Sequence, residues 1–325
     1  MRPERPEQAQ PTTRVRGHTV QPTRMRPEGP KPVVIIGMSR SGTTLVARLL
    51  EGQPGVHLET EPHMLWKAGS FRHLADDVVE DDPRATAWIR DTLLSAARTR
   101  TLVEKSPVNC LRPDLVHRVF PDARIVYVER DAARCIASNF RRTLNQESLK
   151  PAIVLRKYLA PRHQKRDGQN AHDFATHLDA TGGRTLLQQV RPSEWAAFAM
   201  YASRLMWLRQ TKGPLPFGPK TDGFVDIVHR DGPLAYHVEV YRIAKERRAR
   251  FEDLYGDKLA GFRLEALQSD PREIARLYEF CGFPVDRASI DATVKAFDHD
   301  LVARASRTGP YDGEIQRLMK VQGVT

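Results

Sequence analysis

The sequence predicts an α/β fold of the P-loop-like type, in which a central parallel sheet is flanked by helices to give three layers. Two observations support this class. Short, continuous apolar segments alternate along the chain with segments of helical periodicity, which is the order that right-handed strand–helix–strand units require. In addition, a glycine-containing turn, GMSRSGTT at residues 37–44, follows the first apolar segment, as in folds whose first strand-to-helix turn holds a phosphate.

The first predicted strand is residues 31–37, KPVVIIG, a continuous apolar run closed by glycine. Such a run is typical of a strand that is buried on both faces. By similar criteria, the other predicted strands are 55–59, 101–107, 123–131 and 258–267. Apolar residues at helical spacing predict helices at 43–52, 82–98, 112–120, 132–144, 192–210, 232–256 and 270–284. The helix at 192–210 is expected to be amphipathic, with Ser193 as its N-cap.

The composition divides the chain into two parts. Residues 1–31 are rich in proline, arginine and glutamine and predict a flexible basic tail, whereas 32–325 predict a single folded domain. Within that domain, residues 145–192 are polar and carry turn signals with little periodicity. This segment is interpreted as a lid or acceptor-binding insertion, with disorder as the alternative.

Charge, hydropathy and cysteine usage exclude several classes of protein. The 325 residues carry a formal net charge of +11, but the basic residues are too dispersed to predict nucleic-acid binding. No apolar run is long enough to predict a membrane span, and no secretory signal is found, so a cytoplasmic location is expected. Cys110, Cys135 and Cys281 are far apart in sequence, so neither a zinc site nor a disulfide framework is predicted. The oligomeric state cannot be predicted.

The glycine-containing turn has the spacing of a nucleotide-binding loop but lacks its lysine. Gly37 and Gly42 are five residues apart, and Thr43 occupies the position that lysine has in loops that bind nucleoside triphosphates. Backbone N–H groups, a helix N-terminus and the hydroxyls of Thr43 and Thr44 nevertheless predict an anion site. Arg40, inside the turn, is a permanent cation with several donors. The loop therefore favours a nucleotide whose single 5′-phosphate carries a transferable anion.

Three motifs in order give the chain a family resemblance. The segment 37–62, GMSRSGTTLVARLLEGQPGVHLETEP, resembles the 5′-phosphosulfate loop of sulfotransferases that use 3′-phosphoadenosine 5′-phosphosulfate (PAPS), including bacterial and tyrosylprotein-sulfotransferase-like enzymes. VEKSPVN, at 103–109, is similar to their E-K-[ST]-P segment. FPDARIVYVERDAARCIASNF, at 120–140, resembles their 3′-phosphate motif.

A fourth segment, at 262–284, resembles the late Y-E-D-L and D-P elements of these families, although Leu264 and Ala266 replace the usual tyrosine and aspartate. The resemblance is close over 33–140 and loose over 258–285.

The resemblance implies that PAPS is the co-substrate and that no metal is needed. It implies nucleotide contacts from the loop and from the 3′-phosphate motif, and weaker candidates near the C-terminus; these residues are Arg40, Ser41, Gly42, Thr43, Thr44, Arg130, Ser138, Ser306, Arg307 and Lys320. It also implies that Glu61 is the general base and that Arg40 and Lys105 stabilise the transferring group. Glu59 and His63 remain open as alternative bases.

The acceptor is expected to be a hydroxyl or amine of a small molecule, a glycan or a lipid-linked compound. Two other functions remain open at this point: a divergent P-loop nucleotide kinase or NTPase, and a non-catalytic nucleotide-binding protein. Thr43 in the lysine position argues against the first. The joint presence of Arg40, Glu61, Lys105 and Arg130 argues against the second.

Overall fold

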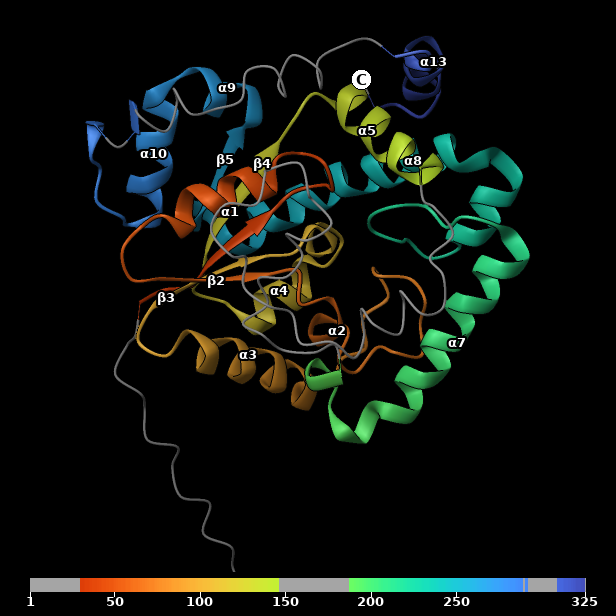
Figure 1. Ribbon diagram of the computed structural model, residues 1–325, viewed down its shortest axis with the longest axis horizontal. Helices are drawn as coiled ribbons and strands as arrows, with labels where there is room; N and C mark the ends of the chain where they lie inside the picture. The colour runs from red at the N-terminus through yellow and green to blue at the C-terminus, as the bar shows by residue number, and fades with distance from the viewer. Residues whose placement is uncertain (1–29, 146–186, 289, 292–308, 325) are drawn as a thin grey trace, which may run out of the picture.

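The computed structural model describes residues 30–145, 187–288, 290–291 and 309–324, and these contain a five-stranded parallel sheet of order β2-β3-β1-β4-β5 (Figure 1). The strands are β1 (Val33–Ile36), β2 (Val56–Thr60), β3 (Thr101–Lys105), β4 (Arg124–Glu129) and β5 (Leu259–Arg263). All four residues of β1 are 0% exposed, as the continuous apolar run predicts for a central parallel strand.

Helices cover both faces of this sheet. They are α1 (Thr43–Glu51), α2 (His63–Trp66), α3 (Pro83–Ala97), α4 (Pro113–Val119), α5 (Ala132–Leu144), α7 (Trp195–Lys212), α8 (Phe224–Tyr255), α9 (Leu264–Ser269), α10 (Pro271–Cys281) and α13 (Asp312–Val321). Val34 and Ile36 pack with residues of α3, α4 and α8, whereas Val33 and Ile35 pack with residues of α1 and α10. Alternate residues of β1 thus enter two separate cores, and the predicted three-layer α/β class is confirmed.

Some element boundaries differ from those predicted. The predicted strand 258–267 ends at Arg263, where α9 begins, and the predicted helix 232–256 belongs to a longer helix, α8. Gly232 interrupts α8 with non-helical angles (φ 85°, ψ 166°), next to Pro233, whose missing N–H cannot complete the helical hydrogen bonds. The predicted tail and most of the predicted lid lie outside the described residues.

The prediction for 192–210 was wrong in two respects. A short 3₁₀ turn (Pro192–Glu194) precedes α7, so that Glu194, and not Ser193, occupies the N-cap position, without a side-chain cap bond. The helix is also not amphipathic, because large apolar side chains lie on its buried side and on its exposed side. The tertiary arrangement of α7 therefore cannot be deduced from a simple division into an apolar and a polar face.

Parallel pairing brings four strand ends to one edge of the sheet. The turn after β1 lies between the residues that follow β3 and those that follow β4, and β2 ends beside β3, with Thr60 opposite Lys105. The chain leaves β1 towards β2 on one side and leaves the neighbouring strand β4 towards β5 on the other. This edge is therefore the topological switch point where open α/β sheets bind ligands.

Candidate active site

The turn between β1 and α1 has a backbone that only particular residues adopt easily. Gly42 has φ 105° at the N-cap of α1, and a Cβ atom there would lie 2.5 Å from Cδ1 of Leu264. Arg40 also has a positive φ of 72° although it is not glycine. Strained backbone of this kind concentrates at functional sites. Ser41 Oγ is buried and has no hydrogen-bond partner among the described residues, so the turn contains a polar group that a ligand would satisfy.

Helix α5 holds this turn in place. Asn139 Nδ2 donates to the carbonyl oxygen of Ser39 at 2.7 Å, and Cys135 Sγ lies 3.1 Å from the same oxygen. Arg40 Nε donates to Ser138 Oγ at 3.0 Å, and Arg130 Nη1 donates to the carbonyl oxygen of Arg40 at 3.1 Å. The residues predicted for the 5′ and the 3′ ends of a nucleotide are therefore brought together.

The same region concentrates positive charge. Desolvation lowers the pKa of Arg40, and the charges of Arg130, Arg142 and Arg141 lower it further. A cation whose surroundings disfavour its charge is stabilised when an anion binds nearby. Arg141 and Arg142 were not singled out from the sequence, although they follow Ser138 on α5 and the paired arginines were a usable signal.

Glu61 and Lys105 form a second group at the same edge. Glu61 follows β2 with a positive φ of 53°, and its N–H donates to the carbonyl oxygen of Lys105 at 2.7 Å. Lys105 Nζ forms an ion pair with Glu61 Oε1, and His63 Nε2 lies 3.3 Å from Glu61 Oε2. Burial alone would raise the pKa of Glu61, but the hydrogen bond from His63 and the charge of Lys105 outweigh it and lower this pKa to about 2.

Glu59 lies apart from this pair. Its side chain is 2% exposed, and its Oε1 lies 3.0 Å from Nε2 of His57. His57 in turn has its Nδ1 2.8 Å from Nη2 of Arg100. Glu59 is opposite Glu104 in the pairing of β2 with β3, whereas Thr60 is opposite Lys105. The pleat therefore directs Glu59 to the face opposite that of Lys105, and the geometry favours Glu61 over Glu59 as a group that meets a ligand.

A buried carboxyl group supports the short helix after Glu61. Glu104 Oε1 accepts hydrogen bonds from Trp66 Nε1 at 2.8 Å and from Ser106 Oγ at 2.5 Å. Burial raises the pKa of Glu104 to about 7, against the effect of these hydrogen bonds. Because Trp66 ends the helix that His63 begins, Glu104 fixes the segment next to Glu61. The sequence did not indicate this role, because it depends on a contact between residues 38 positions apart.

The remaining predicted residues are less closely connected to the site. Thr43 is buried, and Thr44 lies in the first turn of α1. Lys320 is exposed on α13 and forms no hydrogen bond or ion pair with the described site residues. Ser306 and Arg307 lie outside the described residues.

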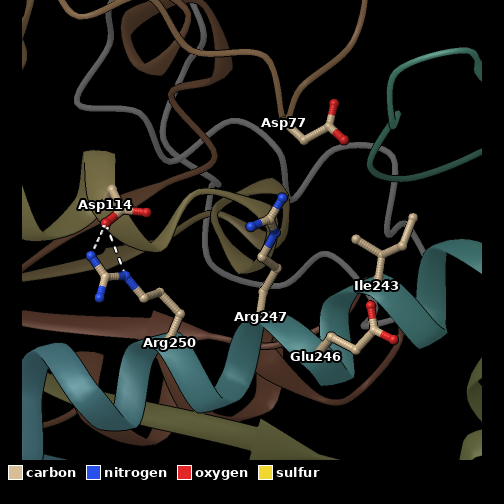
Figure 2. A pocket seen from close by; sticks show the side chains of 6 residues that line it. All are labelled: Asp77, Asp114, Ile243, Glu246, Arg247 and Arg250. Atoms are coloured by element: carbon tan, nitrogen blue, oxygen red, sulfur yellow. Dashed lines mark hydrogen bonds and ion pairs between the residues drawn. The ribbon is translucent and has the colours of Figure 1, made fainter.

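A surface hollow of about 410 Å³ occurs elsewhere, along α8 (Figure 2). Arg250 Nη2 donates to Asp114 Oδ1 at 2.7 Å inside it, and none of its lining residues is a predicted site residue. The lining residues are Asp77, Asp114, Ile243, Glu246, Arg247 and Arg250. In the described part of the chain, no cluster of three or more histidine, cysteine or acidic side chains suits a metal ion. No described helix is long and apolar enough to cross a membrane.

Comparison with known proteins gives one match in sequence and several in structure. Residues 32–180 match the model of the sulfotransferase family. A sequence search of curated proteins found no significant match.

Among solved structures, the chain is similar to a sulfotransferase domain from the Synechococcus PCC 7002 olefin synthase (17% identity, 82% of this chain and 79% of that chain, TM-score 0.42). It is also similar to a sulfotransferase domain from the curacin biosynthetic pathway (16% identity, 90% of this chain and 98% of that chain, TM-score 0.43). A third similar structure is that of a mouse sulfotransferase, SULT7A1, complexed with PAP (12% identity, 87% of this chain and 68% of that chain, TM-score 0.40).

Proposed function

We propose that this chain, which belongs to the sulfotransferase family over residues 32–180, transfers a sulfuryl group from PAPS to a hydroxyl or amine of its acceptor. The family match confirms the resemblance and the enzyme class inferred from the sequence motifs. The observation that carries the finer proposal is that Arg40, Arg130 and Ser138 meet at one edge of the sheet. Glu61 and Lys105 meet at the same edge.

The chain's own groups fit a nucleotide with two separate anionic ends. We assign the 5′ end to Ser41, Gly42, Thr43 and Thr44, where the buried Ser41 hydroxyl lacks a partner among the described residues and the N-terminus of α1 presents N–H groups. We assign the 3′ end to Arg130 and Ser138, which extend the same cationic region.

When bound, PAPS would supply an activated sulfuryl group whose leaving group is a phosphate. Glu61 would accept the proton of the acceptor's O–H or N–H as the acceptor atom forms its bond to sulfur and the bond from sulfur to the phosphate oxygen breaks. Arg40 and Lys105 would stabilise the negative charge that spreads over the sulfuryl and phosphate oxygens. No step requires a metal ion.

The ion pair between Glu61 and Lys105 connects nucleotide binding to base strength. A pKa of about 2 makes Glu61 a weak base, since a base works best when its pKa lies near the working pH. An anion at the loop competes with Glu61 for Lys105. Once Lys105 turns towards that anion, Glu61 keeps its burial but loses a stabilising charge, so its pKa rises. We therefore expect nucleotide binding to precede proton abstraction.

The three cysteines support a cytoplasmic location as part of this proposal, because all of them are free and buried, as is usual in reducing compartments. The acceptor class, whether a small molecule, a glycan or a lipid-linked compound, belongs to the proposal as well.

The test is transfer of label from [³⁵S]PAPS to a panel of alcohols, phenols and amines in the presence of a chelator. We expect labelled product from the wild-type chain and little from Arg40→Ala. The matched control is Arg250→Ala, which removes an exposed arginine of α8 that pairs with Asp114 of α4. This variant should not change the rate. Transfer of phosphate from labelled ATP, with none from PAPS, would instead support the kinase alternative.

A further inference from the structure

Helix α7 packs its apolar side chains against the protein mainly through one side, and Trp195 and Arg204 add hydrogen bonds to the carbonyl oxygens of Val190 and Arg72. Phe198, Tyr201 and Leu208 are buried on that side. The ring centroid of Phe71 lies 5.6 Å from that of Phe198 and 5.8 Å from that of Tyr201. Figure 1 shows α7 along the rim of the molecule, away from the central sheet.

The opposite side of α7 also carries large apolar side chains, and these are exposed. Trp195, Met200, Met206 and Trp207 are exposed by 53%, 56%, 49% and 59%. At 3.6 residues per turn these four side chains fall within an arc of about 140°, and we call this arc the outer face of α7. It holds four of the seven large apolar side chains that are exposed among the described residues. Clustered exposed apolar side chains mark interaction surfaces.

The charge of α7 indicates which partner covers this face. The helix contains no aspartate or glutamate. Arg204 and Arg209 lie about 40° beyond the two edges of the outer face, whereas Lys212 lies on the other side of the helix. The whole chain carries a net charge of +11. Tryptophan is enriched at membrane–water interfaces, and basic residues near a bilayer surface are attracted to anionic lipid headgroups. A second copy of the chain would instead bring like charges together.

We propose that the outer face of α7 docks onto the surface of an anionic lipid bilayer. The two indole rings and the two methionine side chains enter the headgroup region, and Arg204 and Arg209, at the edges of the face, contact lipid phosphates. Docking of this kind does not depend on the reaction proposed above.

The position of α7 gives such docking a consequence that does rest on the proposed function. Met64 of α2 belongs to the same apolar cluster as Phe71, Phe198 and Tyr201, and it lies three residues after Glu61. Docking through α7 would therefore turn towards the lipid the side of the molecule that carries α2 and the segment after Glu61, from which a lipid-linked acceptor could approach.

The first experiment is co-sedimentation of the full chain with phosphatidylcholine vesicles that contain or lack phosphatidylglycerol. We expect binding to the anionic vesicles that weakens as NaCl is raised. The double variant Trp195→Ser/Trp207→Ser should lower the partition coefficient by at least about tenfold, because two half-exposed indoles no longer enter the lipid. The matched control is Val321→Ser, which alters an apolar side chain of α13 that is 77% exposed and should bind like the wild type.

A second measurement does not depend on how well the serine variants fold. Lipids with brominated acyl chains quench tryptophans that enter the bilayer. We expect quenching of the wild type and its loss in Trp195→Phe/Trp207→Phe, which keeps the apolar face, because the remaining Trp66 is 1% exposed and Trp88 is half-buried.

Three results would overturn the proposal. The first is equal binding of the wild type to anionic and neutral vesicles, or binding without quenching. The second is absence of vesicle binding together with a dimer that the serine variant abolishes in sedimentation analysis, which would assign the face to a second copy. The third is absence of vesicle binding together with a lowered melting temperature of the serine variant, which would show that the chain itself covers the face.

Discussion

Replacing Glu61 by glutamine separates its chemical role from its structural one. Glu61→Gln keeps the shape of the side chain but removes the charge that pairs with Lys105 and the atom that would take the acceptor's proton. A positioned general base contributes about 10²- to 10⁴-fold to a rate. We therefore expect kcat to fall by that order, while the dissociation constant for adenosine 3′,5′-bisphosphate stays unchanged or decreases because Lys105 is released.

The stability cost of the same change can be estimated from the pKa. The pKa of Glu61 is lowered from 4.5 to about 2, which corresponds to about 3 kcal/mol of stabilisation of the folded state at pH 7. Because the folded-state pKa is the lower one, this stabilisation is fully present above the unfolded value of 4.5 and is lost as the pH falls through about 2. Glu61→Gln should thus lower the free energy of unfolding by up to about 3 kcal/mol at pH 7, and by less below pH 4.5.

The assay combines denaturant unfolding, nucleotide calorimetry and label transfer to an acceptor whose hydroxyl is not already ionised, such as an alcohol. Glu59→Gln is the matched control, since Glu59 is 2% exposed and paired with His57, and it should cost much less kcat. A Glu61→Gln enzyme that folds and turns over at nearly the wild-type rate would refute the assignment. His63, 3.3 Å from the Glu61 carboxylate, would then be the next base to replace.

Two further predictions follow from buried or strained positions. The pKa of Glu104 is raised to about 7, so the stability that its protonated form provides is present below pH 4.5 and is lost as the pH rises through 7. In urea unfolding, Glu104→Gln should therefore match the stability of the wild type near pH 4 and exceed it by up to about 3 kcal/mol near pH 9. Equal stabilities of the two proteins at both pH values would contradict this. Gly42→Ala places a side chain at φ 105° and 2.5 Å from Leu264, so it should lower the free energy of unfolding by about 1–3 kcal/mol and weaken nucleotide binding. The control is Gly313→Ala, where an added Cβ meets nothing within 4 Å. Similar melting temperatures and nucleotide affinities for the two variants would argue against a constrained loop.

The parts of the fold that could be predicted are those fixed by local pattern. The continuous apolar runs of β1 and β4 identify central strands because both faces of such strands are buried. The order of strands and helices then defines the class. The spacing of Gly37 and Gly42 likewise predicts an anion-binding turn, because those positions set the backbone that aims N–H groups at a ligand.

The rest depends on packing between distant segments. The buried Glu104 carboxyl acquires its role only when α2 brings Trp66 to within 2.8 Å of it. The outer face of α7 was mistaken for part of an amphipathic pattern, because periodicity does not reveal which of two apolar sides is covered. The positive φ of Glu61 is also not visible in the sequence, since non-glycine residues adopt it only under tertiary constraint.

The central claim is that the loop and the end of β4 together bind a nucleotide with a 3′-phosphate, and calorimetry tests it most directly. Adenosine 3′,5′-bisphosphate and AMP are titrated into the wild-type chain and into Ser138→Ala, with a chelator present throughout. Losing a charge-assisted contact costs about 1.5–3 kcal/mol, or roughly ten- to hundredfold in affinity. We predict that the wild type prefers the bisphosphate by at least that factor without any metal and that Ser138→Ala reduces the preference. Equal affinities for the two nucleotides, or binding that disappears in the chelator while the fold is intact, would contradict the account.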